Sequence, residues 1–168
     1  LNKYQIFLDF FSDYSSANEI INYQKKNTGI SRYEILNKLY DLENIEQENE
    51  KKKILNKLNS KMDEFVKKII VKIFIKRKIK KLSINYNLYL ASNAPHEELK
   101  YIIKNNNLEE YFLSIYGSNK NFSKKDSIKL ILDKFKIKKA TYIGDTFNDY
   151  KIAKSLGLKF IGIKSIFL

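Results

Sequence analysis

The sequence predicts an α/β protein in which a parallel, Rossmann-like sheet with covering helices follows a small all-helical part. Apolar segments of strand length alternate with helical patterns from about residue 75 to residue 163. Residues 1–74 show helical spacing and only weak strand signals. A hydrophobic fraction of 43% and an aromatic fraction of 14% indicate a folded chain. We therefore expect a helical domain over residues 1–74 and an α/β domain over residues 75–168.

The first segment allows two interpretations. Its large apolar side chains recur at helical spacing: Tyr4, Phe7, Leu8 and Phe11. The run over residues 4–9 could also be a strand that ends in Asp9. A second helix is expected after Ser15 or Ser16, ending near Gly29, whose lack of a Cβ suits a left-handed C-terminal position.

Two further helices complete the helical part. Ser31 and Glu34 have the spacing of a capping box, in which each side chain accepts a hydrogen bond from the other residue's backbone N–H. A long amphipathic helix is expected next, from the apolar positions between Ile54 and Ile70.

The α/β part is expected to begin with a helix over residues 75–82. Pro95 should open the second helix, at the first helical position that proline favours. The predicted strands cover residues 88–91, 113–116, 140–143 and 159–163, and the predicted helices between them cover residues 95–104, 125–135 and 150–156. This alternation implies right-handed crossovers and a parallel sheet.

Composition restricts the chemistry. The chain has no cysteine, which excludes a disulfide framework, a thiolate zinc site and a cysteine nucleophile. His96 is the only histidine, so a site with several histidines is also excluded. Any bound metal should therefore be held by oxygen atoms.

The net charge of +13 raises the question of a nucleic-acid partner. Arg32 and Arg77 are the only arginines, and the lysines are spread along most helices. We expect no nucleic-acid partner, and instead a positive field that attracts anionic substrates. A basic nucleic-acid-binding module stays as an alternative, which affinity that falls steeply with salt would reveal.

We expect a soluble cytoplasmic protein without membrane contact, since there is no secretory signal and lysines interrupt the apolar run over residues 66–79. Because the chain starts at Leu1, we expect that residues upstream have been removed or left out. The sequence does not set the oligomeric state.

Polar residues follow three of the predicted strands. Ser92 and Asn93 come directly after the first strand, where a hydroxyl and free amides at a helix N-terminus can bind an anion or simply cap the helix. Lys124 or Lys125 opens a later helix, where a cation is unfavourable unless a bound anion such as phosphate compensates it.

The third strand end carries the strongest signal, the run Gly144-Asp145-Thr146-Phe147-Asn148-Asp149. Two carboxylates on a loop at the carboxyl end of a strand can converge on a cation such as Mg²⁺. The alternative is a plain strand–turn–helix joint in which Asp145 is a turn residue and Asp149 is solvated.

Taken in order, the serine, the lysine and the Gly-Asp-x-x-x-Asp motif resemble those of the haloacid dehalogenase-like (HAD) hydrolases. Residues of about 82–163 carry this resemblance, and the Gly-Asp motif is its most specific part. Lys124 is preferred over Lys125 because Asp126 and Ile128 then follow at the offsets usual in the family. The helical part would correspond to a helical cap. Residues 27–33 resemble a segment in the caps of phosphatase-like members, which makes Arg32 a candidate for substrate contact; the alternative is a surface arginine.

The resemblance implies a phosphatase that acts on a small phosphorylated metabolite such as a sugar phosphate. An aspartate would attack the phosphate and form an aspartyl-phosphate, which water then hydrolyses. Mg²⁺ would be held by Asp145 and Asp149, directly or through water. Ser92 and the Asn93 amide would bind phosphate oxygens, and Lys124 would offset their charge.

The family's Asp-x-Asp motif, which supplies the nucleophile on the first strand, does not occur in this sequence. Asp9 imitates it only in part, because Phe11 takes the place of the second aspartate. We expect the motif-bearing strand to lie upstream of Leu1, so that the chain as given is inactive and its sheet has an unpaired gap. The alternative function is a non-catalytic HAD-like protein that binds a phosphorylated ligand or a partner.

Overall fold

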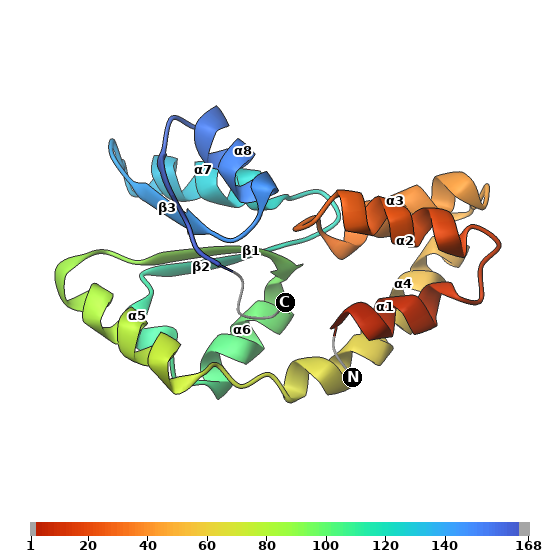
Figure 1. The fold of residues 1–168 in the computed structure, drawn as a ribbon, viewed down its shortest axis with the longest axis horizontal. Coiled ribbons are helices and arrows are strands. Elements are labelled where there is room, and N and C mark those ends of the chain that lie inside the picture. The colour runs from red at the N-terminus through yellow and green to blue at the C-terminus, as the bar shows by residue number, and fades with distance from the viewer. Residues whose placement is uncertain (1–2, 165–168) are drawn as a thin grey trace.

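The computed structural model describes residues 3–164 and has two parts (Figure 1). The four N-terminal helices lie together on one side of the molecule, and the strands with their helices lie on the other. The N-terminal helices are α1 (Lys3–Phe11), α2 (Ala17–Lys26), α3 (Arg32–Leu42) and α4 (Glu48–Lys67).

These helices bury a core of their own. Phe7, Phe10 and Phe11 of α1 are fully buried against apolar side chains of α2, α3 and α4. The segment over residues 4–9 is helical, so the alternative of a strand is wrong. Asp9 therefore does not end a strand; it lies exposed on α1, where its Oδ1 accepts a hydrogen bond from Gln5 Nε2 at 3.0 Å. Burial of the aromatic face decides the matter, since a helix places all three phenylalanines in one core.

The turn between α2 and α3 has the predicted local chemistry. Gly29 has a φ of +82°, in the left-handed region that glycine adopts without strain. Ser31 and Glu34 form the predicted capping box at the start of α3. The cap fixes the direction of α3 because it satisfies backbone N–H groups that the first turn leaves free.

The rest of the chain alternates helices and strands as predicted. Its elements are α5 (Ile73–Asn85), β1 (Tyr89–Pro95), α6 (His96–Asn105), the 3₁₀-helix η1 (Glu109–Tyr111), β2 (Ser114–Ser118), α7 (Lys124–Lys134), β3 (Thr141–Gly144), α8 (Phe147–Ser155) and β4 (Lys159–Gly162). The protein is thus an α/β protein with a small helical part. No helix within residues 3–164 is long and apolar enough to cross a membrane.

The strands form two parallel ladders. β1 pairs with β2 from Tyr89 opposite Ser114, and β3 pairs with β4 from Thr141 opposite Lys159. Both ladders are parallel, as the alternation of elements predicts. Within the described residues the two ladders are not hydrogen-bonded to each other, so they make two two-stranded sheets instead of one continuous sheet.

The predicted boundary between the first strand and the helix that follows it is wrong. β1 extends through Ser92 and Asn93 to Pro95, which pairs with Ser118 and is the N-cap of α6 instead of its first residue. The extended ψ of 143° at Pro95 keeps this residue in the strand. Gly117 allows the close approach, because a Cβ there would lie 2.5 Å from the His96 Cα.

Candidate active site

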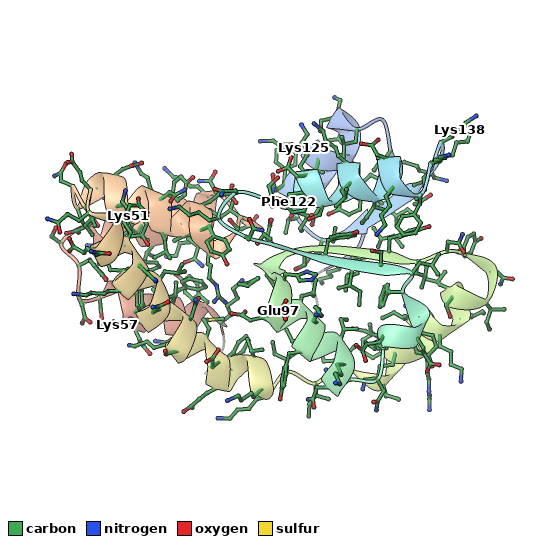
Figure 2. The ribbon with its side chains drawn as sticks, turned by 180° about the vertical axis from the view of Figure 1, so that it is seen from behind. Lys51, Lys57, Glu97, Phe122, Lys125 and Lys138 are labelled. Atoms are coloured by element: carbon green, nitrogen blue, oxygen red, sulfur yellow. The ribbon has the colours of Figure 1, made fainter. Side chains whose placement is uncertain are left out.

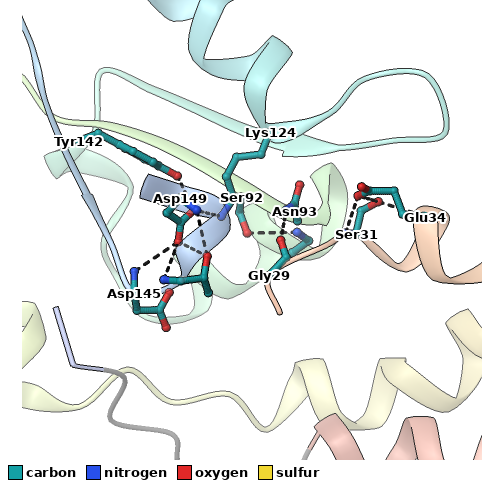
Figure 3. Close-up of polar contacts among 11 residues, drawn as sticks. Gly29, Ser31, Glu34, Ser92, Asn93, Lys124, Tyr142, Asp145 and Asp149 are labelled. Atoms are coloured by element: carbon teal, nitrogen blue, oxygen red, sulfur yellow. Dashed lines mark hydrogen bonds and ion pairs between the residues drawn. The ribbon is translucent and has the colours of Figure 1, made fainter. Parts of the chain in front are cut away.

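The predicted site residues come together where loops leave β1, β2 and β3 (Figure 3). Ser92 and Asn93 come from the end of β1, Lys124 from the start of α7, and Asp145 and Asp149 from the loop after β3 and the first turn of α8. Parallel pairing places the carboxyl ends of β1 and β2 at the same edge of their sheet, and the contact between Lys124 and Asp149 joins this edge to the end of β3. The residues behind three separate sequence signals therefore lie near one another.

Asp149 is the most constrained residue of the site. Its side chain is buried, with 2% exposure. It occupies the third position of α8 and forms a capping box with Thr146, which also donates its N–H and hydroxyl to Oδ2 at 3.2 and 2.8 Å. The backbone N–H of Asp145 donates to the same oxygen at 3.3 Å. Asp149 thus fixes the loop that carries Asp145.

The other oxygen of Asp149 has two further donors. Lys124 Nζ lies 2.8 Å from Oδ1, and the Tyr142 hydroxyl donates to Oδ1 at 2.7 Å. Figure 3 shows both contacts converging on this carboxylate. The Lys124 side chain is only 13% exposed, so the ion pair is largely shielded from water. An internal carboxylate therefore compensates the cation at the N-terminus of α7.

These contacts set the ionisation of the site. Burial would raise the pKa of Asp149, but the charge of Lys124 and the hydrogen bonds from Lys124, Tyr142 and Thr146 outweigh it and lower the pKa to about 2. Burial, together with the hydrogen bond to Asp149, raises the pKa of Tyr142 above its ordinary value. Asp149 is therefore a carboxylate and Tyr142 a neutral donor near neutral pH.

Asp145 differs from Asp149 in its surroundings. Its side chain is exposed, and no hydrogen bond or ion pair of its carboxylate is found among residues 3–164. Such a carboxylate can accept a hard cation, and Mg²⁺ commonly binds one or two carboxylates and keeps several waters. Both oxygens of Asp149 already accept hydrogen bonds. The described residues contain no group of three or more metal-ligating side chains. The exposed carboxylate of Asp145 thus fits Mg²⁺. The carboxylate of Asp149 holds the loop that carries Asp145 through hydrogen bonds to its backbone.

Ser92 and Asn93 lie in the strand itself. The Ser92 hydroxyl oxygen accepts a hydrogen bond from the N–H of Ala94 at 3.1 Å. The Asn93 side-chain amide donates to the backbone carbonyl of Gly29, which belongs to the turn before α3. Gly29 also packs closely against Thr146 of the α/β part, because a Cβ on Gly29 would lie 2.8 Å from Thr146 Oγ1. The helical part therefore reaches both the end of β1 and the loop after β3.

Arg32 is not a surface arginine. It is 4% exposed, and its Nη2 donates a hydrogen bond to Glu98 Oε2, on α6, at 2.7 Å, while its Nη1 lies 2.6 Å from Glu98 Oε1 as an ion pair. A second hydrogen bond, from Nη1, reaches Asn59 Oδ1 on α4 at 2.6 Å. Burial raises the pKa of Glu98, and the Arg32 charge opposes this effect. Arg32 thus joins the helical part to the α/β part next to the site.

The sequence model of haloacid dehalogenase-like hydrolases matches residues 2–163. The chain belongs to this family. No curated protein matches the sequence significantly.

Solved structures support the fold assignment. A HAD-like family hydrolase from Streptococcus pneumoniae has 17% identity and a TM-score of 0.64, with 96% of this chain and 79% of that chain covered. A predicted phosphoglycolate phosphatase from Haemophilus somnus has 18% identity and a TM-score of 0.68, with 94% and 76% covered. A Clostridium difficile protein named as a phosphatase has 19% identity and a TM-score of 0.65, with 98% and 82% covered. At these identities the likeness concerns the fold, which is a HAD-like core with a helical cap.

Three residues that contribute to the site of this HAD-like hydrolase are not predicted from its sequence. Thr146 could have been found, because Thr146 and Asp149 have the same spacing as the capping box predicted at Ser31. Tyr142 had only a weak signal as an aromatic residue in a strand. Glu98 had none, since nothing local links it to an arginine 66 positions away.

Proposed function

We propose that this HAD-like hydrolase removes phosphate from a small phosphorylated metabolite, such as a sugar phosphate, through an aspartyl-phosphate intermediate with Mg²⁺. We further propose that residues 1–74 act as the cap of an α/β core formed by residues 75–168. The observation that carries the proposal is the buried Lys124–Asp149 pair, which lies beside the exposed carboxylate of Asp145 at the strand ends.

Each residue of the site would have a separate role. Asp145 would hold Mg²⁺, which on binding neutralises charge on the phosphate that is transferred. Lys124 is held in place by Asp149, so its charge can stabilise the phosphate oxygens. Ser92 and the backbone N–H of Asn93 would bind phosphate oxygens. The cap loop around Gly29 lies against Asn93 and Thr146, where it can limit the access of water.

The covalent step needs an aspartate whose oxygen attacks phosphorus while the ester bond to the leaving alcohol breaks. Water then hydrolyses the acyl phosphate and restores the carboxylate. Residues 1–168 contain no Asp-x-Asp motif, and Asp9 lies on α1 in the helical part. The same observation favours the second candidate, a non-catalytic HAD-like protein that binds a phosphorylated ligand.

The test is phosphate release by the full-length protein from a panel of sugar phosphates and p-nitrophenyl phosphate, with Mg²⁺ or with EDTA. We expect turnover that requires Mg²⁺ and that falls by about 10²-fold or more in Asp145→Asn and in Lys124→Met. The matched controls are Asp133→Asn, which changes an exposed carboxylate on α7, and Lys125→Met (Figure 2). Both controls should keep wild-type activity.

Two results would decide between the candidates. Equal activity in Asp145→Asn, or turnover that is independent of Mg²⁺, would overturn the phosphatase proposal. Absence of turnover on all substrates, together with calorimetric binding of a sugar phosphate that Lys124→Met abolishes, would support the non-catalytic protein.

A further inference from the structure

We propose that Glu98 is a positioning residue that, through Arg32, latches the cap loop of residues 27–31 over the active-site loops. Arg32 is the first residue of α3, and Glu98 lies in the first turn of α6. The two side chains meet across the boundary between the helical and the α/β parts. Two short contacts, an ion pair at 2.6 Å and a hydrogen bond at 2.7 Å, engage both oxygens of Glu98, which fixes the direction as well as the distance between the two helices.

Burial sets this pair apart from most ion pairs among residues 3–164; the Lys124–Asp149 pair, inside the α/β part, is shielded to a similar degree. The Arg32 side chain is 3% exposed and the Glu98 side chain 15% exposed. Within residues 3–164, the other ion pair between the cap and the core, Lys120 with Glu48, has both side chains more than half exposed. Separating a shielded pair without hydrating both charges is strongly unfavourable. The pair therefore stays closed until the boundary opens far enough to admit water.

The pair is connected directly to the loop that covers the site. Arg32 follows Ser31, and the turn at Gly29 lies two residues further back along the chain. The Gly29 carbonyl accepts from the Asn93 side chain, and Gly29 lies against Thr146. When Arg32 is held by Glu98, the loop is held against both Asn93 and Thr146. Release of the pair removes the strongest of the three anchors.

The contact of Arg32 with Asn59 indicates which of the contacts of Arg32 separates when the cap opens. Asn59 lies on α4, in the same helical part as Arg32, and accepts from the guanidinium at 2.6 Å. This contact does not cross the boundary, so Arg32 can keep it while the cap moves. Opening therefore separates Arg32 from Glu98 and leaves the arginine attached to the cap.

The test compares Glu98→Gln with Glu97→Gln by hydrogen exchange in the full-length protein. Glutamine keeps the shape of the side chain and removes its charge. Glu97 is the neighbouring residue on the same turn (Figure 2), with a side chain 83% exposed and paired only loosely with Lys100 at 3.7 Å. We expect amides of residues 27–31 and 92–94 to exchange about tenfold or more faster in Glu98→Gln, and at wild-type rates in Glu97→Gln.

The exchange rates of amides in the core of the cap, at residues 54–62 of α4, distinguish a local effect on the loop from a general loss of stability. These amides should exchange at wild-type rates in Glu98→Gln, and Glu98→Asp should restore part of the loop's protection. Unchanged exchange in the loop, or a uniform rise over the loop and α4 together, would overturn the proposal. In the double variant Arg32→Glu/Glu98→Arg, which swaps the two charges, the loop amides should be more protected from exchange than in Glu98→Gln. Equal or lower protection would also contradict the proposal.

A kinetic readout rests on the proposed function. If the cap must close for turnover, Glu98→Gln should raise KM by about tenfold with a smaller change in kcat. Absence of turnover in the wild-type protein would refute the proposed function but would leave the exchange result on the latch intact.

Discussion

The hydroxyl of Tyr142 donates a 2.7 Å hydrogen bond to the buried carboxylate of Asp149, seven residues further along the chain. Tyr142 lies on β3 and Asp149 in the first turn of α8, so the bond spans the loop that presents Asp145. It reaches the same oxygen as Lys124. Tyr142 therefore helps to fix both the lysine and the loop at the site.

Tyr142→Phe tests this role. The substitution keeps the ring and removes one hydrogen bond to a buried charged acceptor, which should lower the free energy of unfolding by about 1.5–3 kcal/mol. It should also raise the pKa of Asp149, which an NMR titration of the carboxyl carbon would measure. Tyr150→Phe is the control, because Tyr150 is 41% exposed and its ring stacks with Phe147 and meets Phe160 in a T-shaped contact. Equal stability of the two variants would contradict the role.

Acid sensitivity should trace to Asp149. Its pKa is about 2 in the folded protein against an ordinary value of 3.8, so the unfolded chain takes up more protons as the pH falls. The stabilisation is fully present above about pH 4 and is lost as the pH falls through 2. We expect the wild-type protein to lose about 2 kcal/mol more than Asp149→Asn between pH 4 and pH 2.

Urea unfolding at several pH values would measure this difference. The comparison with Asp149→Asn is needed because other carboxylates, such as Glu43 and Asp126, also have lowered pKa values. Parallel stability curves for the two proteins over this pH range would show that Asp149 does not carry the effect.

The packing of the cap loop can be tested at Gly29. Gly29→Ala adds a Cβ to a residue whose backbone is in the left-handed region. This Cβ would lie 2.8 Å from the Thr146 hydroxyl oxygen. Gly157→Ala is the matched control, since its φ is +66° and no atom lies within 4 Å of the added Cβ. The conformational cost, about 1–2 kcal/mol, should be common to both variants, and Gly29→Ala should lose at least about 1 kcal/mol more.

Chemical unfolding of the two variants would measure the extra cost. Equal losses at the two positions would show that the loop does not press against Thr146. A larger loss at Gly29 that disappears in a Thr146→Gly background would assign the cost to this contact.

The sequence by itself determined the features that depend on neighbouring residues. The capping box at Ser31, the left-handed turn at Gly29 and the alternation of helices and parallel strands are all present as predicted. Their hydrogen bonds close within a few residues or follow from side-chain periodicity, so the local sequence contains the required information. The motif at the end of β3 is of this kind too, because Gly144 is the last residue of the strand and Asp145 follows it directly.

Only the tertiary structure decided what each candidate residue touches. Asp145 and Asp149 look equivalent in the sequence, but Asp149 is buried under five donor groups while Asp145 is exposed. Arg32 meets Glu98 across 66 positions. Such contacts depend on how separately formed elements pack, and burial then sets their strength by removing water. The spacing of residues along the chain cannot reveal them.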